Sequence, residues 1–220
     1  MELDLFVRYG PALLSGFGVT ILCWIVGTAG GLVLGFLVAC LYRWAPLAPL
    51  RWLIDFYVEL IRGTPFMIQL FILYYGGPYL GLVLTPVQAG ILSFIVYGSP
   101  YFAEIFRSGF NAIPKGQIEA ARCVGLSETR IMRRIILPQM LVPITAPLTN
   151  FIIILSKETA ILSVVTVPEL LYETQTMASE TFTYVEPFLV LSLFYWLMVI
   201  ATSWLGGRVE ARVTRHLKRA

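Results

Sequence analysis

The sequence predicts an all-α integral membrane protein with five transmembrane helices. Of its 220 residues, 58% are hydrophobic and only 13% are charged, whereas about a quarter of the residues in a soluble domain carry a charge. A helix needs about 20 apolar residues to cross a bilayer core of about 30 Å, and stretches of this kind recur along the chain. The basic residues between them are concentrated in alternate connections. These observations exclude a soluble globular domain.

Five apolar stretches account for the predicted membrane spans. The first ends where Arg43, Pro46 and Pro49 interrupt the apolar run, since a charge and two prolines oppose its continuation. An amphipathic segment, residues 50–62, precedes the second stretch, and its charges indicate a position at the membrane interface or partly buried in protein. The predicted spans are residues 13–41, 65–80, 87–110, 148–167 and 187–205.

The first and third spans contain residues that bear on helix packing. Gly27, Gly31 and Gly35 repeat at a spacing of four on one face of the first span, which predicts close contact with another helix. Pro100 lies within the third span and predicts a kink there. The acidic start of the chain and the length of the first apolar run predict that the first helix is retained, not removed as a signal peptide.

Lysine and arginine residues predict the orientation in the membrane, because connections rich in them stay on the cytoplasmic side. Basic residues occur between the first and second spans, between the third and fourth, and in the tail 208–220. The opposite connections, residues 81–86 and 168–186, contain no lysine or arginine, and the second carries four glutamates. We therefore expect the N-terminus outside and the C-terminus in the cytosol.

Several kinds of site have no support in the sequence. Cys23, Cys40 and Cys123 lie far apart, and the only histidine, His216, is in the basic tail. These residues form no metal-binding pattern, disulfide framework or catalytic set for an intramembrane enzyme. The chain also lacks the G-x-x-x-x-G-K-[ST] phosphate loop, so it does not bind ATP by that means. We expect no catalytic residue, no bound metal and no nucleic-acid partner.

A polar, helix-prone loop interrupts the apolar chain at residues 113–138. Residues 117–124 are rich in helix formers, and Gly125 permits a turn that a side chain would hinder. A second helical pattern follows over residues 126–136, and Pro138 is expected to end it. Two short helices joined at an angle would form a rigid projection on the cytosolic side.

The spacing within this loop is specific. An E-A-A triplet is followed after three residues by glycine, and nine residues later by I-x-L-P. This pattern resembles the coupling loop of the membrane subunits of ATP-binding-cassette (ABC) importers. The alternative, a solvated loop with helical propensity, would not account for the full spacing over twenty positions. The matching residues are Glu119, Ala120, Ala121, Gly125, Ile135, Leu137 and Pro138.

The resemblance implies a type I (MetI-like) importer transmembrane domain. A single permease domain would occupy residues 1–220, with its core at 57–205 and the coupling loop at 113–138. In such importers the loop docks into a groove of a separate ATPase chain, which binds ATP and Mg²⁺, so this chain would bind no cofactor itself. The implied partners are ABC ATPase subunits, a second permease subunit, a periplasmic solute-binding protein and membrane lipid, and the implied location is the bacterial inner membrane.

Three further stretches, residues 57–69, 102–117 and 150–170, resemble the permeases that take up polar amino acids such as histidine, glutamine and arginine, or related opines. The expected function is thus ATP-driven import of a polar amino acid or related compound. The chain departs from the pattern of these permeases at Pro100 and Glu158, which leaves the exact substrate open. A homodimer and a pair of related permeases are equally compatible with the sequence.

Ionisable groups inside a span are costly unless they are paired or hydrated, so each one suggests a role. Lys157 and Glu158 fall near the middle of the predicted fourth span, where they could line a pathway for a zwitterionic substrate or pair with another span. Glu104 and Arg107 are expected to form a structural ion pair within one helix. The other candidates for the pathway or gate are Glu59, Arg62 and Gln69, beside a Gly63-Thr64-Pro65 bend that could be a hinge or a helix-start corner.

The principal alternative function is secondary transport of a small polar solute, driven by an ion gradient. Such transporters usually contain an internal repeat and more spans, and this chain shows no clear repeat. The outer acidic segment, residues 169–186, could contact a binding protein or could be a solvated connection.

Overall fold

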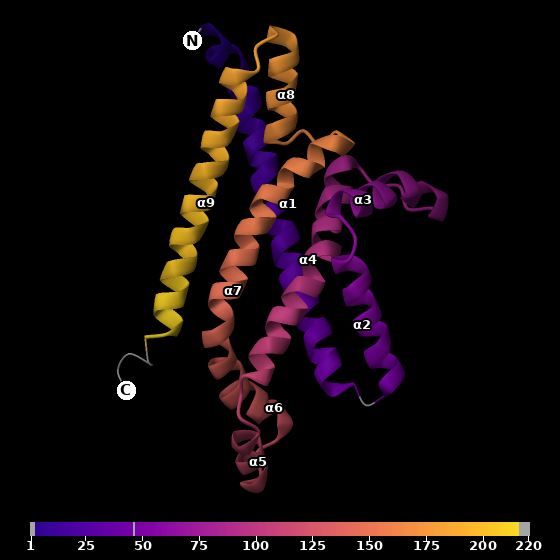
Figure 1. Cartoon of the computed structure of the whole chain (residues 1–220), viewed down its shortest axis with the longest axis vertical. Coiled ribbons are helices and arrows are strands. Elements are labelled where there is room, and N and C mark those ends of the chain that lie inside the picture. Colours follow the sequence, from indigo (N-terminus) through magenta and orange to yellow (C-terminus); the bar gives the residue numbers. More distant parts are fainter. Residues whose placement is uncertain (1–2, 46, 216–220) are drawn as a thin grey trace.

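The computed structural model of the protein describes residues 3–45 and 47–215, which form helices and no strand (Figure 1). Three residues of the basic tail, His216, Lys218 and Arg219, lie outside the described residues. The elements are α1 (Leu3–Trp44), α2 (Ala48–Arg62), α3 (Phe66–Phe71), η1 (Ile72–Gly76), η2 (Gly77–Leu80), α4 (Pro86–Asn111), α5 (Lys115–Cys123), α6 (Glu128–Ile131), η3 (Met132–Ile136), α7 (Leu137–Glu158), η4 (Thr159–Val165), α8 (Leu170–Thr181) and α9 (Val185–Val213).

The helices α1, α4 and α9 confirm the first, third and fifth predicted spans. Each is long and apolar enough to cross a membrane. α1 and α9 extend several residues beyond the predicted limits, because their terminal turns include charged residues that lie outside the apolar runs. Pro100 lies inside α4, which is one helix from Pro86 to Asn111.

The predicted glycine face of α1 packs against α4. A Cβ atom added at Gly27 would lie 2.4 Å from the Cβ of Phe94, and one added at Gly35 would lie 2.6 Å from the carbonyl oxygen of Ser99. At these positions only glycine lets the two backbones approach so closely. The prediction of a close helix contact is confirmed, and the partner helix belongs to the same chain.

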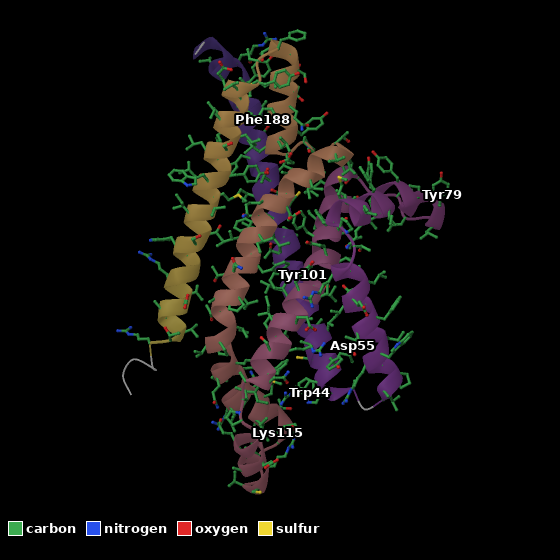
Figure 2. All side chains as sticks on the ribbon, in the orientation of Figure 1. Trp44, Asp55, Tyr79, Tyr101, Lys115 and Phe188 are labelled. Atoms are coloured by element: carbon green, nitrogen blue, oxygen red, sulfur yellow. The ribbon has the colours of Figure 1, made fainter. Side chains whose placement is uncertain are left out.

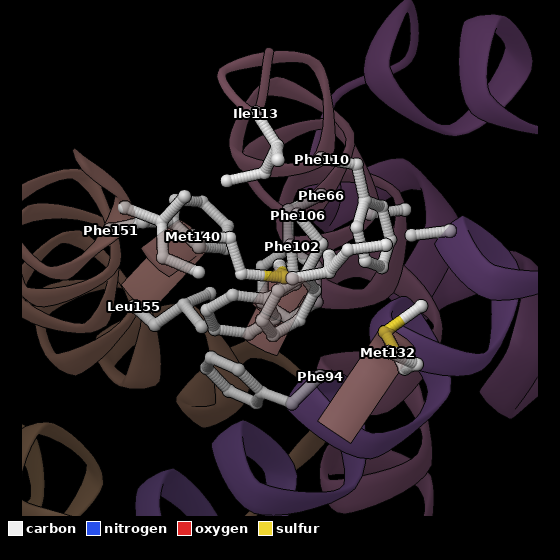
Figure 3. Close-up of a cluster of buried hydrophobic side chains, with 14 of the residues drawn as sticks. Phe66, Phe94, Phe102, Phe106, Phe110, Ile113, Met132, Met140, Phe151 and Leu155 are labelled. Atoms are coloured by element: carbon white, nitrogen blue, oxygen red, sulfur yellow. The ribbon is translucent and has the colours of Figure 1, made fainter. Parts of the chain in front are cut away.

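Aromatic side chains of α4 form the centre of the core (Figure 3). Phe94 and Phe102 are fully buried, and the ring of Phe102 meets that of Phe151 on α7 edge to face, with centroids 4.9 Å apart. Phe66 from α3 packs on Phe94 with centroids 5.0 Å apart. Because lipid tails are as apolar as these rings, close packing rather than transfer from water holds the helices together.

The second predicted span is wrong as a simple helix. The segment from Phe66 to Leu80 makes an angle of 104° with α2, so that α2 and this segment form at most one bent span together. Pro65 precedes α3 in an extended conformation and lacks the N–H that would continue α2. A π-helical turn, η1, interrupts the second half of the segment. The bend turns the amphipathic α2 toward α4, against which it packs.

The fourth predicted span begins too late and continues too far as a regular helix. α7 starts at Leu137, includes Pro143 and Pro147, and ends at Glu158, after which η4 forms a 3₁₀ segment. Prolines are tolerated inside a membrane helix because neighbouring groups satisfy the freed carbonyls. Lys157 and Glu158 therefore lie at the end of α7, not at the middle of a span as predicted. The outer connection also differs, since α8 occupies much of it.

The basic connections gather at one end of the molecule. Figure 1 shows α5, α6, the end of α1, the start of α2 and the last turns of α9 at this end, with α8 and the start of α1 at the other. The structure thus agrees with the alternation of basic and acidic connections from which the orientation was predicted. We call this the basic end below.

Candidate functional site

The predicted coupling loop forms two short helices joined by a left-handed turn. Gly125 follows α5 with φ of +76°. Its N–H donates to the carbonyl of Arg122 at 2.9 Å, and the N–H of Leu126 donates to the carbonyl of Ala121 at 3.1 Å. This pair of bonds is a Schellman motif, which closes a helix at a residue with positive φ. A Cβ at Gly125 would meet nothing within 4 Å, so conformation, not space, is the requirement for glycine.

Buried apolar side chains fasten the loop to the bundle. Ile118 and Ala121 on the inner face of α5 belong to the same core cluster as Ile131, Met132 and Ile136. Outside this cluster, Arg122 and Glu128 form a two-bond ion pair at 2.6 and 3.2 Å. Both side chains are 56% exposed, and an exposed ion pair contributes little to stability because water screens it. Burial and the turn therefore define the shape of the loop.

The motif residues divide between the interior and the surface. Ala121 is buried, Ile135 and Leu137 are half-buried, and Glu119 and Ala120 are exposed on α5 together with Gly125 in the turn. The exposed set is available to a partner. One expectation is wrong: Pro138 does not end the second helix, because it lies in the first turn of α7. The π-helical η3 precedes it and carries the helical course from α6 into α7.

A polar pocket lies between α2 and α4, with a volume of about 480 Å³. Figure 2 labels Asp55 on α2 and Tyr101 on α4, the two helices that form it. The structure brings two pairs predicted separately, Glu59 with Arg62 and Glu104 with Arg107, into this one site. The lining residues are Asp55, Val58, Glu59, Arg62, Gly63, Tyr101, Glu104 and Arg107.

The charges in this pocket are not equally engaged. The Nη1 of Arg107 lies 2.7 Å from Glu104 and 3.4 Å from Asp55, which agrees with the predicted structural pair and adds a second carboxylate to it. The guanidinium of Arg62 lies over the ring of Tyr101, 5.3 Å from its centroid. No basic group of residues 7–45 and 47–215 lies within ion-pair distance of Glu59. Glu59 and Arg62 thus offer one free charge of each sign.

The side chain of Gln69 stabilises the corner between α2 and α3. Its Nε2 donates to the carbonyls of Ile61 at 2.7 Å and Thr64 at 3.0 Å, and to the Thr64 hydroxyl at 2.8 Å. A Cβ at Gly63 would come within 2.8 Å of the Glu59 carbonyl oxygen, so the bend has little room. These contacts favour the helix-start corner for this segment, and a pathway role of Gln69 stays a prediction.

Lys157 and Glu158 are separate from the polar pocket. Lys157 is exposed and Glu158 is half-buried at the end of α7, and neither lines the cavity between α2 and α4. In the described part of the chain neither forms an ion pair. The predicted pathway residues therefore fall into two groups at different places in the bundle.

The chain matches the family described as binding-protein-dependent transport system inner membrane component over residues 31–215. The chain belongs to this family. A probable amino-acid ABC transporter permease of Bacillus subtilis, YckA, is 38% identical over 94% of this chain and 91% of its own length. The arginine transport system permease ArtQ of the same organism is 33% identical, covering 92% of this chain and 93% of the relative.

Two solved structures are similar to this fold. The crystal structure of an amino acid ABC transporter with histidines has a TM-score of 0.86 and 31% identity, over 96% of this chain and 99% of that one. An inward-facing methionine ABC transporter, MetNI, has a TM-score of 0.74 at 23% identity, over 97% of this chain and 99% of that one. The second likeness concerns the fold alone. It agrees with the predicted type I importer architecture.

Membership of this family confirms several predictions about the location, activity and partners of the chain. The chain is a multi-pass ABC permease of the bacterial inner membrane, is not itself an enzyme, and belongs with a separate ATPase, a permease partner and a solute-binding protein. The alternative of an ion-driven secondary transporter is thereby set aside.

Sequence reasoning missed one structural site of this permease, Glu169. It belongs to the acidic outer segment, residues 169–186, but its side chain is 0% exposed. Its Oε1 accepts the N–H of Tyr172 at 2.8 Å and so caps α8, while its Oε2 accepts the hydroxyls of Thr20 and Tyr195, each at 3.4 Å. Burial raises the pKa of Glu169 to about 7. Glutamate is not among the residues preferred at an N-cap, so the sequence carries no signal for this cap.

Proposed function

We propose that this chain is the permease of an ATP-driven importer for a polar amino acid or related compound, with residues 113–138 as the contact to its ATPase. The observation that carries the proposal is the coupling loop: a turn that requires glycine, an inner face fixed in the core and an outer face left exposed. The substrate class is supported by the names of the relatives and by a pocket with a free acid and a free base.

The loop is built to transmit a displacement. Glu119 and Ala120 lie on the exposed face of α5, where a groove of an ATPase would receive them. The helix α5 packs against α6, which continues through η3 into α7 without a break, and only a short connection separates α5 from α4. A push on α5 would therefore move the ends of α4 and α7 together. ATP and Mg²⁺ would be held by the ATPase chain.

The polar pocket has the chemistry for a zwitterion. The carboxylate of an amino acid can pair with the Arg62 guanidinium. Its ammonium group can donate hydrogen bonds to the Glu59 carboxylate. The remaining charges, Arg107 with Glu104 and Asp55, are paired with one another and would shape the site. Lys157 and Glu158 stay candidates for a second point along the pathway.

The remaining arrangement follows the predicted orientation. The N-terminus would lie outside and the basic end in the cytosol, facing the ATPase. The acidic outer end around α8 would face a periplasmic binding protein, and a second permease, identical or related, would complete the pathway.

Capture of the ATPase from a mild detergent extract tests the coupling loop. Glu119→Lys reverses a charge on the exposed face of α5 and should abolish capture. Glu210→Lys makes the same charge change on an exposed residue of α9 at the same end and should leave capture intact. Equal capture by both variants would contradict the assignment of the loop.

Uptake by proteoliposomes containing the assembled transporter tests the pocket. Loss of a hydrogen bond to a charged group costs about 1.5–3 kcal/mol, so Glu59→Gln and Arg62→Gln should each raise KM for the amino acid by roughly 10- to 100-fold while ATPase capture persists. Glu210→Gln is the control. Unchanged KM in both pocket variants would remove this site from the pathway, and uptake without ATP would overturn the proposed function.

A further inference from the structure

A second pocket, which shares only Arg107 with the one between α2 and α4, opens at the basic end. It lies among the end of α1, the first turn of α2 and the end of α4, and its volume is about 510 Å³. Its lining is basic and contains no carboxylate. The residues are Ala39, Tyr42, Arg43, Arg51, Arg107, Phe110, Asn111 and Lys115.

Three of the four cations in this pocket have no carboxylate partner among residues 7–45 and 47–215. Arg107 is engaged with Glu104 and Asp55, and Asp55 also accepts the hydroxyl of Tyr42 at 3.4 Å. By contrast, Arg43, Arg51 and Lys115 form no ion pair in this range. Like charges brought to one cavity repel each other unless an anion neutralises them. The composition of the pocket therefore calls for an anionic ligand.

The cationic groups are positioned, not freely solvated. The guanidinium of Arg43 lies over the ring of Phe110, 5.2 Å from its centroid, and that of Arg107 lies over Tyr42 at 3.9 Å. The Nε of Arg51 donates to the Ala45 carbonyl at 3.1 Å, which leaves its terminal nitrogens available. Guanidinium groups held in this way bind phosphate oxygens through paired N–H donors.

The surroundings of the pocket place it at the level of lipid headgroups. Trp44 and Trp52 follow the lining residues Arg43 and Arg51 in the sequence and are 51% and 65% exposed. The ring of Trp52 stacks on that of Phe56 with centroids 5.8 Å apart. Tryptophan at the end of a membrane helix marks the boundary between lipid tails and water. Figure 2 shows Trp44 and Lys115 at this same end of the molecule. Exposed Leu41 and Leu53 nearby would contact acyl chains.

From the charge, the donors and the depth in the membrane, we infer that this pocket binds the phosphate of an anionic phospholipid. Arg43 and Arg51 contact the phosphate, and Lys115 adds a third positive charge from the start of α5. The assignment of this lipid to the cytosolic leaflet rests on the proposed orientation, but the binding itself does not. A bound lipid would link α1, α2 and α4 where α5 begins.

Native mass spectrometry of the full chain in detergent tests this inference by titration with phosphatidylglycerol, and with phosphatidylcholine as the uncharged comparison. A basic residue near the membrane contributes about 1 kcal/mol toward anionic lipid, or about fivefold in affinity. The variant R43Q/R51Q/K115Q should therefore bind phosphatidylglycerol roughly 100-fold more weakly. The matched control R208Q/R212Q/R215Q removes the same charge from the end of α9 and should retain the binding.

Two further experiments distinguish loss of binding from loss of folding, and a lipid phosphate from free phosphate. R43K/R51K keeps the charges, so it should bind phosphatidylglycerol more tightly than the triple variant does. Circular dichroism reports the helix content of all variants and so checks that each one is folded. Inorganic phosphate at millimolar concentration should not displace the lipid. Displacement by phosphate, binding of phosphatidylcholine with equal affinity, or equal losses in the triple variant and its control would each overturn the inference. ATPase capture and uptake are measured separately, so failure here is distinguishable from failure of the proposed function.

Discussion

Replacement of Gly125 isolates the conformational requirement of the coupling loop. A non-glycine residue in the left-handed region costs roughly 1–2 kcal/mol. In Gly125→Ala this is the whole expected effect, because φ is +76° and the new Cβ meets nothing within 4 Å. An effect of this size lowers the population of the native turn relative to that of the open turn about 5- to 30-fold. Asparagine tolerates this region better than alanine, so Gly125→Asn should fall between alanine and glycine.

Hydrogen exchange measures this population directly through the amides of Gly125 and Leu126, which form the two bonds of the turn at 2.9 and 3.1 Å. Protection of both should fall 5- to 30-fold in Gly125→Ala, and ATPase affinity should fall by no more than the same factor. Gly116→Ala is the matched control: this glycine lies within α5 and also has open space at its Cβ, so protection should be unchanged or increased. Unchanged protection in Gly125→Ala, or an equal loss in Gly116→Ala, would refute the reasoning.

Three further predictions concern the stability of the bundle. Gly35→Ala should destabilise the chain by roughly 1–3 kcal/mol, because the new Cβ would lie 2.6 Å from a backbone oxygen of α4. The thermal midpoint in detergent should therefore fall. The control Gly18→Ala, whose Cβ would have open space, should not lower this midpoint. Glu169 has a folded pKa of about 7, above its ordinary 4.5, so its stabilising contribution is complete below about pH 4.5 and is lost as pH rises through 7. The wild-type midpoint should fall over this window by an amount equivalent to about 3 kcal/mol, and a slope that persists in Glu169→Gln would exclude this carboxyl as its source. Arg122→Ala should leave the midpoint of chemical unfolding unchanged, since its pair with Glu128 is exposed and water screens such pairs. A clear fall in the midpoint would show that the pair, not burial, defines the loop.

The coupling loop is the part of this protein that the sequence predicts best. Its turn depends on a bond pattern within six residues, and its glycine is required by local backbone geometry that no distant contact alters. The prediction is wrong only at Pro138. This residue has no N–H to donate, yet the helical course continues from the π-helical η3 into α7. That adjustment depends on packing against the core, which no local pattern reports.

Composition and the alternation of charged connections by themselves determined that this chain is a helical membrane protein. The spacing from Glu119 to Pro138 determined its family resemblance. Both could be predicted because hydrophobic length and turn geometry are local properties of the sequence. Tertiary structure alone decided the angle of 104° at the predicted bend before α3, the meeting of Glu59 and Arg62 with Glu104 and Arg107, and the burial of Glu169. Each of these depends on which helices touch. In a chain whose helices are all apolar enough to face lipid, only close packing distinguishes one arrangement from another.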